Sequence, residues 1–242
     1  MDLVLGTLVL RWYVFTFLAC FLVAGMRDLG WRRTLVFAAW VWSLVWVAEL
    51  ASTRIGVPFG LYHYTGVTRG QELYIADAPL MDSLSFTFLA YAAFCLARAA
   101  LGPRAEAWAL ATTSGILMML LDVVIDPIAV RGDQWFLGRV FYYPEGGAYF
   151  GVPLSNFLGW ALVGTAGVGG YLRLARDGRG CRYEPGIALY YAVLAFNLTV
   201  TVWIQEWVLL GLGLLLHVAT VAVLYAGRRR PAMGPGMESQ KA

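Results

Sequence analysis

The sequence predicts an all-α polytopic membrane protein: a bundle of about seven transmembrane helices, with the N-terminus outside and the C-terminus in the cytoplasm. Three observations lead to this fold class: the composition, a series of apolar segments of spanning length, and the uneven placement of arginine. Of the 242 residues, 60% are hydrophobic and 14% are charged, and the mean hydropathy is +0.66. Soluble domains carry about 25% charged residues, so this composition is typical of a chain that lies largely in a bilayer.

Seven apolar segments each approach the ~20 residues that cross ~30 Å of hydrocarbon. They are residues 4–25, 34–51, 83–101, 107–128, 154–174, 187–204 and 207–226. The first continues past Arg11 to Gly25 and lacks the basic region and small-residue cleavage site of a secretory signal, so we expect a retained span. We therefore expect one transmembrane domain over residues 1–226 and a disordered cytoplasmic tail over residues 227–242.

The basic residues gather in alternate connections. Those after the first, third, fifth and seventh segments are Arg27, Arg32, Arg33, Arg98, Arg104, Arg173, Arg176, Arg179, Arg182, Arg228, Arg229, Arg230 and Lys241. The other connections hold only Arg54, Arg69, Arg131 and Arg139. By the positive-inside rule the first group faces the cytoplasm. An outer N-terminus and an inner C-terminus require an odd number of spans, which seven satisfies.

The apolar segment 107–128 carries two carboxylates near its end, Asp122 and Asp126, and Pro127 directly follows the second. Residues four apart lie on the same face of a helix. An ionisable side chain is costly in a bilayer, so this pair predicts a functional site that faces the bundle interior, and the alternative is a polar clamp between helices.

Further acids stand at the same outer level. Glu49 ends the second segment, Asp82 begins the third and Glu206 lies in the turn between the last two. We expect Glu49 to be buried among apolar neighbours, whereas Asp82 could serve as a helix N-cap and Glu206 could be solvated in its turn. Acids on separate spans at one level favour a shared polar pocket in the outer half of the membrane.

The two long outer connections, residues 54–79 and 131–153, combine glycine and proline turn signals with many aromatic residues, including Tyr62, Tyr64 and Trp135. These rings form either an ordinary interfacial belt or a lid over the pocket that can face a cation. Further polar or aromatic groups at the outer level are Asn156, Trp160 and Asn197. The two amides serve either the pocket or hydrogen bonds between helices.

Missing residue types exclude several kinds of membrane protein. A retinal protein needs a lysine within a helix, and the only lysine is Lys241 in the tail. A prenyltransferase holds Mg²⁺ with acidic motifs, and no second Asp-rich run is present. Two histidines and three well-separated cysteines predict neither a metal site nor a disulfide framework. A transporter remains an alternative, because buried carboxylates also form proton relays, although no clear inverted repeat is present.

A group of motifs resembles one family. They are Glu49, Gly56-x-Pro58-Phe59-Gly60-x-Tyr62-x-Tyr64, Pro79, Asp122-x-x-x-Asp126-Pro127 and Tyr149-Phe150-Gly151-Val152-Pro153-x-x-Asn156-Phe157-x-Gly159-Trp160. Together they resemble the membrane carotenoid hydratases, which include the gamma-carotene 1',2'-hydratases and bisanhydrobacterioruberin hydratases. The likeness covers residues 49 to 160. The chain departs from it after Trp135, where Phe136-Leu137 replaces an expected second tryptophan.

The resemblance implies a hydratase that adds water across the terminal C1=C2 bond of an acyclic C40 or C50 carotenoid such as lycopene or gamma-carotene. Such an enzyme protonates the alkene and lets water capture a tertiary carbocation, without metal, redox cofactor or nucleotide. Two stacked buried carboxyls tend to share one proton, so we expect the acid within the Asp122/Asp126 pair. Glu49 or Asp82 would orient the water and Asn156 would bind it. The expected aromatic wall consists of Tyr62, Tyr64, Trp135 and Trp160.

Two alternatives stay open at this point. A carotene end-group cyclase begins with the same protonation but lets a neighbouring double bond attack the cation. A proton-coupled transporter or a carotenoid-binding scaffold would not convert its ligand. We expect the bilayer, water and the carotenoid as partners and no nucleic acid. The absence of an acidic excess argues against a haloarchaeal source, so we expect a multi-pass protein of a bacterial inner membrane.

Overall fold

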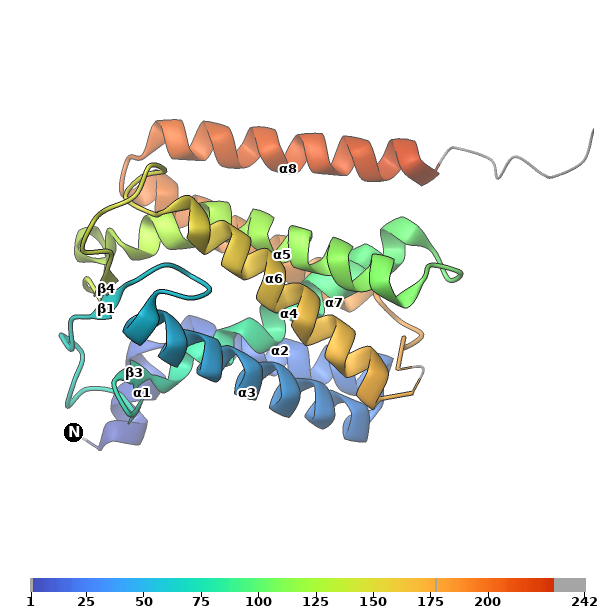
Figure 1. Ribbon diagram of the computed structural model, residues 1–242, viewed down its shortest axis with the longest axis horizontal. Helices are drawn as coiled ribbons and strands as arrows, with labels where there is room; N and C mark the ends of the chain where they lie inside the picture. Colours follow the sequence, from blue (N-terminus) through green and yellow to red (C-terminus); the bar gives the residue numbers. More distant parts are fainter. Residues whose placement is uncertain (1, 177, 229–242) are drawn as a thin grey trace, which may run out of the picture.

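A computed structural model describes residues 2–176 and 178–228 and shows an elongated bundle of helices (Figure 1). Most helices run roughly along the long axis, and the connections gather at the two ends (Figure 1). The helices are α1 (Leu3–Leu10), α2 (Trp12–Asp28), α3 (Trp31–Ile55), α4 (Leu80–Leu101), α5 (Ala107–Ala129), α6 (Leu154–Leu174), α7 (Glu184–Trp203) and α8 (Trp207–Arg228). Residues 229–242, most of the predicted tail, lie outside the described part of the chain.

Several of these helices can cross a membrane. Five are long and apolar enough to do so: α3, α4, α5, α7 and α8. The α1–α2 pair passes the same test as one broken span, which brings the number to six. Helix α6 occupies the expected segment 154–174 but is not among them. The described chain therefore has five or six apolar helices of spanning length, while the count of seven and the orientation of the termini stay predictions.

The first apolar segment, predicted as a retained span over residues 4–25, is broken by a sharp bend. Helix α1 ends at Leu10, α2 begins at Trp12, and the two are bent by 83°. Between them, the side chain of Arg11 is buried and hydrogen-bonded to Glu72 in the first long loop. An unpaired guanidinium in hydrocarbon is costly, so the bend turns this charge toward partners inside the protein.

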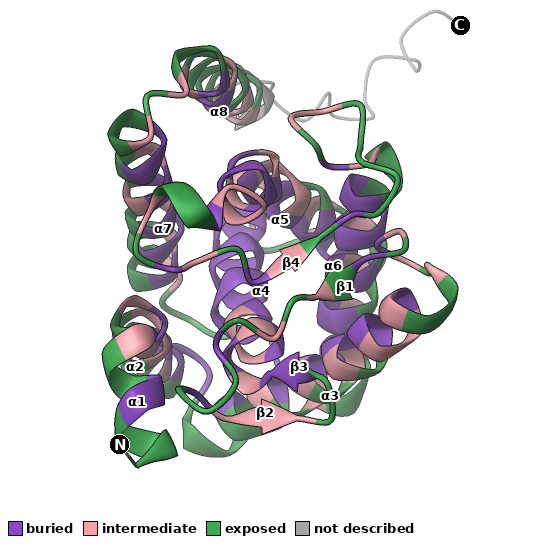
Figure 2. Ribbon diagram, turned by 90° about the vertical axis from the view of Figure 1, so that its left-hand side faces the viewer, coloured by how far each residue is buried: buried purple, intermediate pink, exposed green. Residues whose placement is uncertain are grey.

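Helix α4 forms the centre of the bundle and α8 its edge. In the most apolar 18-residue stretch of α4, 78% of the residues are buried, whereas only 17% are buried in the corresponding stretch of α8. Helix α4 contacts α2, α3, α5, α6, α7 and α8. Figure 2 shows α4 enclosed by its neighbours and α8 at the edge of the bundle with an exposed outer side. The apolar side chains exposed on α8 fit a helix that faces lipid rather than water.

Helices α5 and α6 cross closely through small residues. A Cβ atom on Gly115 of α5 would overlap the backbone of Ala161 and the side chain of Thr165 on α6. A Cβ atom on Gly164 would lie 2.9 Å from the Cα atom of Gly115. Glycines therefore allow the two backbones to approach, as small residues do in other membrane helix pairs.

A cap closes one end of the bundle. It consists of the connections 56–79 and 130–153, joined by antiparallel pairing of β1 with β4 (Figures 1 and 2). A second short ladder, β2 with β3, lies within the first connection. The strands are β1 (His63–Tyr64), β2 (Tyr74–Ile75), β3 (Ala78–Pro79) and β4 (Phe141–Tyr142). The two long connections are therefore tied together rather than independent loops.

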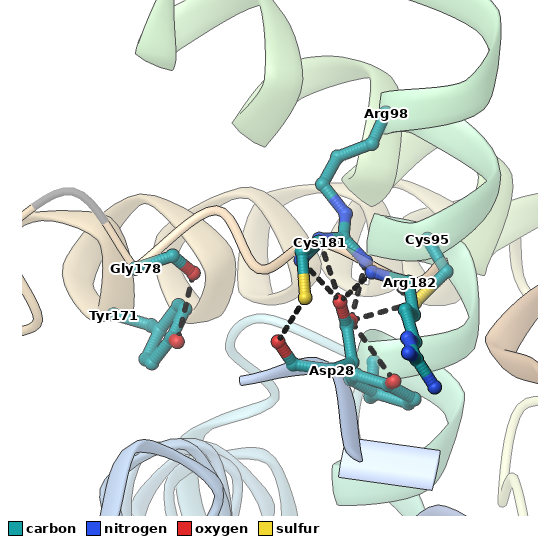
Figure 3. Close-up of polar contacts among 8 residues, drawn as sticks. Asp28, Cys95, Arg98, Tyr171, Gly178, Cys181 and Arg182 are labelled. Carbon is teal, nitrogen blue, oxygen red and sulfur yellow. Dashed lines mark hydrogen bonds and ion pairs between the residues drawn. The ribbon is translucent and has the colours of Figure 1, made fainter. Parts of the chain in front are cut away.

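At the opposite end, Asp28 joins three parts of the chain (Figure 3). Its carboxylate, at the end of α2, accepts hydrogen bonds from Tyr91 at 3.0 Å and from Arg98 on α4. It also accepts the backbone N–H groups of Cys181 and Arg182 at 2.8 and 2.7 Å. This buried carboxylate fastens the connection between α6 and α7 to α2 and α4.

Candidate active site

A cavity of about 150 Å³ lies beneath the cap. Helices α2 to α7 and both connections of the cap contribute to its wall. Its polar or charged side chains include Arg11, Glu49, Asp82, Ser85, Asp126, Asn156 and Asn197. Most of the remaining wall is apolar or aromatic. The cavity therefore places a few carboxyl groups within largely hydrophobic surroundings.

Asp122 and Asp126 meet Asn156 across the α5–α6 crossing. The amide nitrogen of Asn156 donates to Asp122 Oδ2 at 2.6 Å and to Asp126 Oδ2 at 2.7 Å. The two carboxyl groups therefore meet at one shared donor, one helical turn apart on α5. Among the described residues neither carboxyl has an ion-pair partner. Two neighbouring carboxyl groups without a cation repel each other when both are ionised, so this arrangement fits a pair that shares one proton.

The two members of the pair differ in access. Asp126 lines the cavity, whereas Asp122 is fully buried behind it and does not. Asp122 Oδ1 is a buried oxygen with no hydrogen-bond partner among the described residues. A ligand in the cavity can therefore contact Asp126, and Asp122 can act on it only through Asp126 or Asn156.

Glu49 reaches the cavity from α3 and is 3% exposed, which confirms its expected burial. Its Oε2 atom has no hydrogen-bond partner among the described residues. Its carboxyl lies close enough to Asp82 and Asp126 to interact with both charges. Glu49 is therefore near both of the other acids of the cavity wall.

Asp82 lines the cavity from the first turn of α4, next to a buried cation. Its Oδ1 atom lies 3.3 Å from Nη1 of Arg11. Nε and Nη2 of Arg11 each donate to a carboxylate oxygen of Glu72 at 2.8 Å. The N-cap position of α4 belongs to Pro79, so Asp82 forms an ion pair instead of serving as the N-cap.

The four aromatic residues expected in the wall all line the cavity: Tyr62, Tyr64, Trp135 and Trp160. Trp160 stacks on Phe86 with ring centroids 4.1 Å apart. Tyr62 packs edge-on against Tyr64 at 5.4 Å. Burial raises the pKa of both tyrosines in the cap well above the ordinary value, so they stay neutral.

Comparisons with known proteins identify the family. Residues 1–220 match the family described as Carotenoid biosynthesis protein. The chain belongs to this family. It is 32% identical over 205 residues to bisanhydrobacterioruberin hydratase of Haloarcula japonica, across 80% of this chain and 67% of that protein. No solved structure matches the chain. The resemblance to the carotenoid hydratases is confirmed at the level of the family, and the chain has a role in carotenoid biosynthesis.

In this carotenoid biosynthesis protein, Glu206 lies outside the cavity. Its carboxylate pairs with Arg131 at 2.8 Å, and both side chains are about one quarter exposed. The expectation that Glu206 shares the pocket is therefore wrong. Arg131, just after the end of α5, holds the Glu206 carboxylate at the turn between α7 and α8 instead. Asn197 lines the cavity but donates to the carbonyl of Val193 within α7.

Sequence reasoning missed two charged residues and several rings. Arg11 carried a usable signal, because a lone arginine within an apolar segment needs a partner. Glu72 carried no signal in the sequence, since it pairs with a residue 61 positions away. The unexpected aromatic residues of the wall are Tyr13, Phe17, Phe86, Phe88, Phe141 and Phe196. Within residues 2–176 and 178–228, no group of three or more His, Cys, Asp or Glu side chains is arranged to hold a metal ion.

Proposed function

We propose that this protein is a carotenoid 1,2-hydratase that adds water across the terminal C1=C2 bond of an acyclic carotenoid end group. Family membership supports a hydratase role in carotenoid biosynthesis. One observation carries the proposal further: a carboxyl pair that shares the Asn156 amide, and has no cationic partner among the described residues, faces an aromatic cavity through Asp126. An alkene requires such a neutral acid for its protonation.

The reaction assigns a task to each part of the wall. Asp126 donates a proton to C2, and the positive charge develops on C1. Aromatic faces such as that of Trp160 stabilise this cation. Asn156 holds Asp126 and Asp122 in place, and a water molecule oriented by Glu49 or Asp82 attacks C1. No step requires a redox change.

The cavity fits an end group and not a whole carotenoid. A volume of about 150 Å³ holds a ligand of roughly benzene size. The polyene must therefore extend out of the bundle. Tyr13 and Phe17 of α2 and Phe196 of α7 line one side of the cavity, and Trp12 beside them is 52% exposed. We propose that the substrate reaches the cavity from the lipid along this seam.

Product analysis tests the function. Cells that make lycopene or gamma-carotene and express the protein should accumulate a carotenoid heavier by one water, detected by mass spectrometry. Asp126→Asn should abolish this product while the protein still inserts into the membrane. Asp77→Asn is a matched control, because Asp77 is largely exposed in the cap and pairs with Arg69. Unchanged carotenoids, or a cyclised product of unchanged mass, would contradict the proposal.

A further inference from the structure

We propose that Arg11 is a positioning residue that keeps Asp82 ionised, so that Asp82 accepts a proton from the attacking water while the Asp122/Asp126 pair supplies one. This inference rests on the proposed hydration and deepens it. It divides the acids of the cavity into a proton donor on α5 and a proton acceptor on α4.

Each nitrogen of the Arg11 guanidinium lies next to a carboxylate. Two of its nitrogens donate to Glu72, the third faces Asp82, and the residue is 2% exposed. A buried arginine with a bidentate carboxylate partner is held in a fixed geometry. One cation between two carboxylates leaves one excess negative charge. This charge belongs to the side of the cluster that opens into the cavity.

That open side is Asp82. The side chain of Asp82 is 21% exposed, whereas that of Glu72 is fully buried. The titratable groups near Asp82 are Arg11, Tyr13, Glu49, Tyr62, Tyr64, Glu72, Tyr74 and, across the cavity, Asp126. Arg11 is the only cation among them. In contrast, the carboxyl pair on α5 is bridged by the neutral amide of Asn156.

The local fold positions the cluster of Arg11, Glu72 and Asp82. The break between α1 and α2 turns Arg11 inward. In the preceding turn, Thr7 is 1% exposed, and its hydroxyl accepts the backbone N–H of Leu73 at 2.9 Å. This bond fixes the segment beside Glu72 to α1. Two independent contacts, at Thr7 and Arg11, thus hold the first loop of the cap against the start of the chain.

The division of roles gives a balanced cycle. The O–H bond of the carboxyl pair breaks as a C–H bond forms at C2, and C1 becomes a cation. The water oxygen forms a bond to C1, and one of its protons passes to the carboxylate of Asp82. Glu49, which lies near both Asp82 and Asp126, can relay that proton back to the pair through water. The net change is the addition of H and OH to the alkene.

Infrared spectra of the full chain in lipid nanodiscs test the charge assignment without any substrate. Asp82→Asn should remove a carboxylate band and leave the carboxylic-acid bands of the wild type unchanged. Arg11→Met should add a carboxylic-acid band, and Arg11→Met combined with Asp82→Asn should lose it again. Arg69→Met, which removes an exposed cation of the cap, should add none. An acid band lost in Asp82→Asn alone would overturn the proposal even if Arg11→Met does not fold.

Kinetic measurements distinguish an effect of the Arg11 charge from a purely structural effect of the side chain. Arg11→Met should lower kcat by about 100-fold, the typical contribution of one acid–base group, with little change in KM. Arg11→Lys keeps the charge and should recover activity to within about tenfold of the wild type. A folded Arg11→Lys variant no better than Arg11→Met would overturn the role of the charge. If the spectra agree but no carotenoid is hydrated, the proposed function fails and the assignment of charges stands.

Discussion

At the scale of the residue, Asn156 holds the proposed acid together. Its amide nitrogen serves both carboxyl groups at 2.6 and 2.7 Å and is buried with them. A carboxyl group that loses such a donor keeps its desolvation cost without the compensating bond. The amide is therefore important for both stability and geometry.

The variant Asn156→Leu should destabilise the protein by about 1–3 kcal/mol and lower the hydration yield strongly, because the two acids lose their common donor. Thermal unfolding in detergent measures the first effect and carotenoid analysis the second. Asn197→Leu is the matched control for stability, since its amide bonds only within α7. A larger loss of melting temperature in Asn197→Leu than in Asn156→Leu would contradict this role.

Several of these residues could be predicted from the sequence. Charged residues stand out in an apolar segment, so Glu49, Asp82 and the α5 pair were found. The partners of these acids were not. The Glu72–Arg11 contact depends on a loop returning to the start of the chain, which no local pattern records. Phe86 stacks on Trp160, but one phenylalanine among many in an apolar helix carries no distinguishing signal.

At the scale of the element, the site depends on the α5–α6 crossing. The carboxyl pair sits on α5 and its amide partner on α6, so the spacing of the two backbones sets the contact. Gly115 and Gly164 allow that spacing. Helix positions were predictable to within a few residues from apolar runs, whereas the break at Arg11 was not, because its cause lies in a tertiary ion pair.

Gly115→Ala should force α5 and α6 apart, because the added methyl group meets the Ala161 carbonyl and Thr165. We expect a loss of about 1–3 kcal/mol in stability, typical of overpacking, together with reduced hydration. Unfolding and product assays on purified protein measure both. Gly211→Ala on α8 has open space around its new methyl group and should leave stability unchanged or slightly higher. Equal effects of the two substitutions would refute the importance of the crossing.

Asp28 tests the opposite end of the bundle. Asp28→Ala leaves the buried Arg98 without its carboxylate and frees two backbone N–H groups of the α6–α7 connection. Breaking a buried pair in this way should cost about 3–5 kcal/mol in the free energy of unfolding. Arg69→Ala removes an exposed ion pair and should cost less than ~1 kcal/mol. Denaturation curves that do not separate the two variants would contradict the assigned role of Asp28.

At the scale of the whole molecule, the two ends of the bundle differ in charge and in structure. The cap and the cavity occupy one end, and the Asp28 cluster with its neighbouring arginines occupies the other. The arginine distribution predicts that the cap lies outside and the Asp28 end in the cytoplasm. If so, water reaches the cavity from the non-cytoplasmic side.

Thiol labelling tests this orientation. A membrane-impermeant maleimide should label an Asp77→Cys variant in intact cells, because Asp77 is exposed in the cap. The native Cys181, exposed at the Asp28 end, should be labelled only after the cells are opened. Replacing Cys20 and Cys95 by alanine removes other signals. Labelling of Cys181 in intact cells would reverse the predicted topology.

The central claim is that a carboxyl group of the α5 pair protonates a carotenoid end group and that water captures the resulting cation. Isotope labelling of the purified enzyme in nanodiscs tests it most directly. In D₂O enriched with ¹⁸O, the hydroxylated product should carry one non-exchangeable deuterium at C2 and one ¹⁸O at C1, and Asp126→Asn should form none. Product without deuterium at C2, or full activity of Asp126→Asn, would contradict it.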